Sequence, residues 1–70
     1  MKKIRINGKV CHKFDIAYLI NKVAPYRHIS VIYEEYSYKE LCEKLYNVLK
    51  RKERYDILNH IEWFDNIAPF

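Results

Sequence analysis

The stretch Ser37–Lys52, SYKELCEKLYNVLKRK, decides the fold of this chain. Its first residue and Glu40 form an S-x-x-E capping box, in which both side chains accept hydrogen bonds from free N–H groups at a helix start. Leu41, Leu45 and Val48 follow at helical spacing, and with the flanking Tyr38, Cys42 and Leu49 they make one broad apolar stripe on a helix about four turns long. We therefore predict an amphipathic helix over residues 37–52, and the rest of the chain must supply its partner surface.

Length and composition indicate one small domain over residues 1–70, with 50% hydrophobic and 31% charged residues. A chain this short buries about 60% of its unfolded surface, so its fold depends on good packing or a staple. It has two cysteines, no signal-peptide pattern and no apolar run of the roughly 20 residues that a membrane span needs. We expect a cytoplasmic protein with reduced thiols and no membrane contact.

The net charge of +4 is distributed in bands along the chain. Residues 1–27 carry seven Lys or Arg against one Asp, and residues 28–46 carry two against four Glu. Residues 47–54 carry four basic side chains against one acid, and residues 55–70 carry none against three. Such alternation suits a protein partner of matching charge at least as well as a nucleic-acid backbone.

Residues 2–14 are predicted to form a β-hairpin around the turn Asn7-Gly8. A two-residue turn pairs Ile4 with Cys11 and places both on one face. A three-residue loop instead pairs Ile4 with Val10 and turns Cys11 away from the core. We favour the second register because Val10 and the alternate residues after it, His12 and Phe14, then share the core face.

A short helix, Ile16–Ala24, is predicted next, with Asp15 as its N-cap and Pro25 ending it. The β-branched segment Arg27–Glu34 is predicted to be a third strand, parallel to the second through a right-handed crossover. The fold class is thus α+β in the order ββαβα, with the strands covered by helices and a C-terminal helical tail.

The tail carries a second apolar stripe, Ile57, Ile61 and Phe64, which is rotated by about 120° or more from the first. Either the helix breaks within residues 50–56, with Asp56 capping a third helix, or one long helix turns a different face outward. No Gly or Pro marks a break.

An enzyme is not indicated. The single glycine excludes a Gly-rich phosphate loop, and the nucleophile candidates are Ser30, Ser37 and Cys42. Ser37 is better explained as a helix cap and Cys42 as a small core residue. We expect no catalytic residues.

Zinc is the one cofactor that the residue types suggest. Cys11, His28, Cys42 and His60, with His12 as a substitute for Cys11, are ligands suited to a structural zinc ion. The chain lacks the C-x₂-C and H-x₃-H pairs that make a zinc prediction strong. Our expectation is therefore no cofactor, with structural zinc as the alternative.

Two surfaces are candidates for binding. The basic run Lys50, Arg51, Lys52 and Arg54, with seven tyrosines for stacking, suits nucleic acid, although a helix C-terminus favours basic residues by its dipole alone. The second surface interleaves tyrosines with carboxylates, as protein interfaces do. It consists of Tyr33, Glu34, Glu35, Tyr36 and Tyr38, with Trp63 and Phe64 from the tail.

This YEEYSYKE patch, the short length and the Lys/Ile/Tyr/Asn-rich composition resemble small inhibitors from phages and mobile elements, of which anti-CRISPR proteins are an example. The resemblance implies a protein that binds a host effector and blocks nucleic-acid loading or a conformational step without catalysis. The net positive charge departs from the strongly acidic members that mimic DNA. We expect a non-enzymatic protein-binding inhibitor of a nucleic-acid-handling effector; the alternative is a small basic nucleic-acid-binding protein, with or without zinc.

Overall fold

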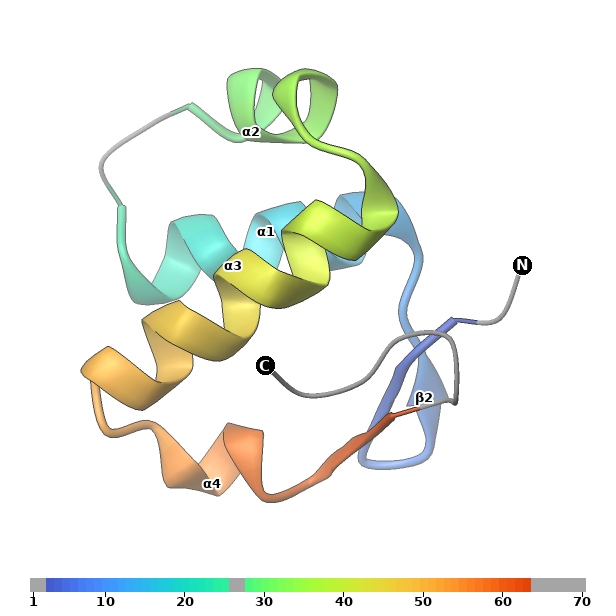
Figure 1. Cartoon of the computed structure of the whole chain (residues 1–70), viewed down its shortest axis with the longest axis vertical. Coiled ribbons are helices and arrows are strands. Elements are labelled where there is room, and N and C mark those ends of the chain that lie inside the picture. The colour runs from blue at the N-terminus through green and yellow to red at the C-terminus, as the bar shows by residue number, and fades with distance from the viewer. Residues whose placement is uncertain (1–2, 26–27, 64–70) are drawn as a thin grey trace.

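The computed structural model describes residues 3–25 and 28–63, which form four helices and three short strands (Figure 1). Their order is β1 (Arg5–Ile6), β2 (Lys9–Val10), α1 (Lys13–Val23), α2 (Ile29–Glu35), α3 (Tyr38–Arg51), α4 (Tyr55–Leu58) and β3 (Ile61–Glu62). The α+β class is confirmed. The predicted order ββαβα is wrong, because the third strand comes from the end of the described chain.

Helix α3 begins as predicted. The Ser37 hydroxyl accepts a hydrogen bond from the Glu40 N–H at 3.3 Å, and the Glu40 carboxylate accepts one from the Ser37 N–H at 2.9 Å. Helix α3 lies alongside α1 (Figure 1). Its buried side chains are Tyr38, Leu41, Cys42, Leu45, Val48 and Leu49.

The hairpin adopts the register that we did not favour. Asn7 and Gly8 both have left-handed backbone angles, with φ of 55° and 79°, as a two-residue type I′ turn requires. Arg5 therefore pairs with Val10, and the Cys11 N–H donates to the Ile4 carbonyl at 3.0 Å. Cys11 is buried, and Val10 and the alternate residues after it are exposed.

Helix α1 starts before the predicted Ile16, at Lys13. Asp15 is not its N-cap but lies in the first turn, where the carboxylate accepts the His12 N–H at 2.8 Å. Its acidic charge still lies where the helix dipole favours it.

Residues 29–35 form helix α2, so the predicted strand Arg27–Glu34 and its parallel crossover are wrong. The His28 ring starts the helix by accepting the Ser30 N–H at 3.3 Å through Nδ1. Ile32 is buried and Ile29 is partly buried against the core, at a helical i, i+3 spacing. β-branched side chains favour strands by intrinsic propensity, but Ile29 and Ile32 also fit a helical spacing, and packing against α1 selects the helix.

Helix α3 ends without glycine or proline. Glu53 takes the left-handed position with φ of 56°, the Arg54 N–H donates to the Leu49 carbonyl at 2.8 Å, and the Glu53 N–H donates to the Lys50 carbonyl at 3.2 Å. These two bonds form a Schellman motif. Of the two alternatives, the structure therefore shows the break, but Arg54 rather than Asp56 is the N-cap of α4.

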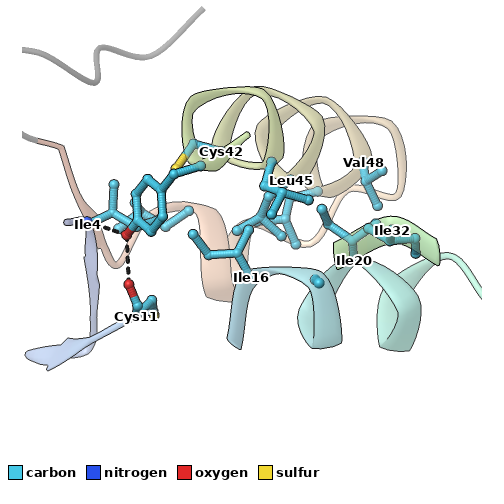
Figure 2. Packing of buried hydrophobic residues seen from close by; sticks show 13 residues of the cluster. Ile4, Cys11, Ile16, Ile20, Ile32, Cys42, Leu45 and Val48 are labelled. Atoms are coloured by element: carbon cyan, nitrogen blue, oxygen red, sulfur yellow. Dashed lines mark hydrogen bonds between the residues drawn. The ribbon is translucent and has the colours of Figure 1, made fainter. Parts of the chain in front are cut away.

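After α4 the chain returns to the hairpin as β3, antiparallel to β1, which gives the sheet order β2-β1-β3. A single core joins the sheet to the helices. Most of its buried side chains come from α1, α3 and the two ends of the hairpin (Figure 2). Its fully buried side chains include Ile4, Ile16, Leu41, Leu45 and Leu49.

Candidate protein-binding surface

The predicted tyrosine and carboxylate patch does not stay together in three dimensions. Tyr33, Glu34 and Glu35 are exposed on α2. Tyr36 is half-buried, and its ring lies 4.9 Å from the Lys44 ammonium. Tyr38 belongs to the core, with 6% of its surface exposed.

Tyr38 is therefore a structural residue, and its predicted role in partner binding is wrong. Its hydroxyl donates to the Cys11 carbonyl at 2.6 Å and accepts the Ile4 N–H at 2.9 Å (Figure 2). Burial raises the pKa of this phenol to about 12, because the charged phenolate would lose its water. The side chain ties the start of α3 to both ends of the hairpin.

Of the two tail residues of the predicted patch, the structure describes Trp63. Trp63 is half-buried and meets Tyr46 edge-on, with ring centroids 6.1 Å apart. Trp63 thus packs against α3 beside the core. Phe64 lies outside the described residues.

A different set of aromatic side chains gathers at the surface. The rings of Phe14 on α1 and Tyr33 on α2 are tilted toward each other with centroids 6.1 Å apart. The Lys13 ammonium lies 4.8 Å from the centre of the Tyr33 ring. Tyr18 follows Phe14 by one helical turn and is equally exposed. We call Phe14, Tyr18 and Tyr33 the aromatic face.

Tyr33 is the member of the aromatic face that the sequence singled out. Phe14 was missed because the wrong hairpin register placed it in the core. The signal was available: Phe14 and Tyr18 recur at i, i+4 on the side of α1 opposite the buried Ile16 and Ile20.

An apolar groove adjoins the aromatic face between β2 and α1. Its volume is about 230 Å³. Ile6, Val10, Tyr18 and Leu19 form its apolar walls, and Lys9 and Asp15 form its polar edge.

The predicted basic surface is divided. The Lys50 ammonium lies 5.9 Å from the Tyr46 ring, and Arg54 binds both carboxylate oxygens of Asp56, at 3.0 and 3.1 Å. Arg51 and Lys52 are exposed at the C-terminal end of α3, where the helix dipole favours cations. Nothing in this geometry aligns the four side chains along one groove.

The nucleophile candidates have structural roles. The Ser30 hydroxyl lies 2.8 Å from Nδ1 of His28, a distance that resembles a nucleophile and its base. The same Nδ1 accepts the Ser30 N–H, and both side chains are exposed, which is the geometry of a helix cap. Ser37 caps α3, and burial raises the pKa of the Cys42 thiol to about 12.

The residues named for zinc are spread over the molecule. Cys11 and Cys42 are free thiols in the core, whereas His28 and His60 are exposed, as is the substitute ligand His12. Over residues 3–25 and 28–63, no three His, Cys, Asp or Glu side chains are grouped to hold a metal ion.

Comparison with protein-family models, curated proteins and solved structures finds no significant match to this chain. In the part of the chain that the structure describes, no helix has the length and apolar character to cross a bilayer.

Proposed function

We propose that this chain is a non-enzymatic protein-binding module that contacts its partner through the aromatic face. The contact between Phe14 and Tyr33 carries the proposal: the rings meet across two helices while 54% and 38% of their surfaces stay exposed. A partner that covers these rings gains the free energy of burying them, and Tyr and Phe are enriched at protein interfaces.

The scaffold below the aromatic face supports this role. Phe14 and Tyr18 stand on a helix whose opposite side is fixed by the buried residues Ile16, Ala17 and Ile20. Side chains on a packed helix lose less conformational freedom on binding than side chains on a loop, so more of the contact energy is retained as affinity.

We further propose that the partner is a nucleic-acid-handling effector, which this chain inhibits by covering its surface. The resemblance in size and composition to small phage and mobile-element inhibitors motivates this part. Glu34 and Glu35 follow Tyr33 directly and are exposed. Carboxylates beside an aromatic side chain complement the basic surfaces with which such effectors hold nucleic acid.

Two arguments support a role without catalysis. In the part of the chain that the structure describes, the buried core holds no charged residue. Its only side-chain polar groups are the hydroxyl of Tyr38 and the thiols of Cys11 and Cys42. Raised pKa values keep Tyr38 and Cys42 protonated at neutral pH, so neither is an activated nucleophile.

Photocrosslinking tests the proposal directly. A photoreactive phenylalanine analogue replaces Phe14 in one variant and the exposed Tyr55 of α4 in a matched control, and both are irradiated in the native host. We expect a discrete protein adduct at position 14 that is absent at position 55. Excess wild-type protein should compete the adduct away, and F14S/Y18S protein should not.

Equal adducts at positions 14 and 55 would overturn the proposal. So would an adduct at position 14 that F14S/Y18S protein reduces as strongly as wild-type protein does. An adduct at position 14 that nuclease removes would favour nucleic acid instead. The crosslinked protein is then purified and titrated with wild type, F14S/Y18S and Y55S, and only F14S/Y18S should lose affinity.

A further inference from the structure

Strand β2 is the outer strand of the sheet, next to β1 alone among the described strands. The Cys11 N–H donates to the Ile4 carbonyl, and the Tyr38 hydroxyl bridges the Ile4 N–H to the Cys11 carbonyl, so Ile4 and Cys11 occupy the position of a hydrogen-bonded pair. Hydrogen-bonded and non-bonded pairs alternate in an antiparallel ladder. The next pair, Arg5 and Val10, is therefore non-bonded, and the N–H and C=O of Val10 point to the outer edge of β2.

The apolar groove adjoins β2, because it lies between this strand and α1. Its walls of Ile6, Val10, Tyr18 and Leu19 enclose about 230 Å³, which accommodates one branched or aromatic side chain. An exposed strand edge beside an apolar groove is the arrangement by which proteins bind extended peptides: backbone groups pair with the edge and one side chain enters the groove.

The charge around the groove selects the kind of peptide. The described part of the hairpin and α1, residues 3–25, carries five basic side chains and one acid, Asp15. Lys9 and Asp15 both line the groove, and the Asp15 carboxylate accepts the His12 N–H. The other four basic side chains of residues 3–25 leave this segment with a net positive charge. A ligand with carboxylates next to its apolar residue therefore complements this site.

We propose that the edge of β2 and the adjoining groove bind an extended peptide segment of the protein partner in which an apolar residue is flanked by Asp or Glu. This inference rests on the proposed function. It specifies what the partner presents to β2 and the groove, namely an apolar residue flanked by carboxylates. At the other end of the contact, Glu34 and Glu35 on α2 face a basic region of the partner. The banded charge of the chain thus predicts a partner with the opposite bands.

The shortness of β2 is consistent with a selective site. A two-residue strand carrying Lys9 resists indiscriminate pairing with other strand edges. Only Val10 offers backbone groups, so the groove and Lys9 supply most of the affinity and the choice of peptide.

Nucleic acid and a second copy of the chain fit this site less well. Nucleic acid has no peptide groups to pair with a strand edge. A second copy pairing antiparallel through Val10 brings the two Lys9 ammonium groups near each other, and like charges oppose such a dimer.

The experiment selects short random displayed peptides on the immobilised full-length protein and measures the enriched peptides by fluorescence anisotropy. Two matched pairs of variants report on the two features. V10P removes the outward N–H of Val10, which makes no hydrogen bond in the ladder. V10A keeps this N–H and serves as the control for the altered side chain in the wall of the groove. K9E reverses the charge at the groove, and K52E makes the same change at the far end of α3.

We expect enriched peptides with an apolar residue between acids. V10P should weaken their binding about tenfold, clearly more than V10A does, and K9E should weaken it about fivefold at low salt, while K52E stays within about twofold. Circular dichroism and thermal melting establish that each variant is folded. If V10P unfolds, peptides N-methylated at the pairing residue test the same hydrogen bonds from the ligand side.

Three results with peptides overturn the inference. They are enrichment of neutral or basic peptides, equal binding by K9E and K52E, and no enrichment above a blank surface. Tighter binding of oligo(dT) than of any peptide, or a dimer in wild type that V10P abolishes, would also overturn it in favour of the other two occupants. Each of these outcomes leaves the crosslink at position 14 intact, whereas failure of the proposed function removes that crosslink.

Discussion

Tyr38 and Tyr33 stand close together in the sequence, in the same run of tyrosines and acids, and the fold gives them opposite roles. Tyr38 is in the core, where its hydroxyl satisfies an N–H and a carbonyl of the hairpin. Tyr33 is on the aromatic face, where its ring meets Phe14 and Lys13 in solvent. This contrast shows that a tyrosine-rich stretch predicts an interface only once it is known which of its hydroxyl groups are buried and bonded in the core and which are exposed.

The largest expected effect is on the core side of this comparison. L45A removes a side chain with no exposed surface and should lower the free energy of unfolding by about 3 kcal/mol, because a cavity is left among α1 and α3. Urea denaturation followed by circular dichroism measures the loss. The half-buried Leu58 of α4 is the matched control, and L58A should cost clearly less; equal losses would mean that the core does not centre on α3.

Y38F keeps the ring and removes only the hydroxyl. We expect a loss of about 2 kcal/mol, because the Ile4 N–H and the Cys11 carbonyl then lack their buried partner. Y33F, which removes an exposed hydroxyl, should leave the urea midpoint unchanged. Similar urea midpoints for Y38F and wild type would show that the Tyr38 hydroxyl does not stabilise the fold.

The same hydroxyl predicts a dependence on pH. The pKa of Tyr38 is raised from 10.0 to about 12 in the folded protein, so folding favours the protonated phenol. This stabilisation is complete below pH 10, the unfolded value, and is lost as the pH rises toward 12. Thermal midpoints measured at increasing alkaline pH should fall more steeply for wild type than for Y38F. Parallel curves would contradict the raised pKa.

Glu53 allows the scaffold to be changed without touching either region. Its left-handed backbone is strained for a residue with a Cβ atom, so E53G should raise stability by about 0.5–1 kcal/mol. E53A keeps the strain and should not. Neither change should alter binding through the aromatic face, and a loss of binding in E53G would show that the end of α3 takes part.

The smallest expected effect on stability belongs to the aromatic face. F14S/Y18S removes two half-exposed rings, and its free energy of unfolding should stay within about 0.5 kcal/mol of wild type. Partner binding should be lost. A large drop in the urea midpoint would mean that these two rings stabilise the fold, which would contradict their assignment as a binding surface.

The sequence predicted best where the signal is local. The capping box of Ser37 and Glu40 and the stripe of Leu41 and Leu45 gave α3 correctly, since both depend on residues within one or two turns. The turn at Asn7-Gly8 was also correct in place. Its register was not, because Val10 and Cys11 are both apolar and only the packed core chooses between them.

The errors fall where distant segments decide. Ile29 and Ile32 fit a strand or a helix, and packing against α1 made them helical. The break after α3 was left open for a local reason. Glu53 stands at a left-handed position where glycine is usual, and the hydrogen bonds of the Schellman motif outweigh the strain. The aromatic face was missed because Phe14 and Tyr33 meet only once α1 and α2 are placed together.

The sequence by itself determined the α+β class, the start of α3, the hairpin turn and the banded charge of this protein. These features follow from contacts between near neighbours and from composition. Only the tertiary structure decided which tyrosines are buried, which hairpin register forms and where β3 pairs. Those choices depend on hydroxyl, backbone and apolar partners that lie far apart along the chain, and burial against them fixes the outcome.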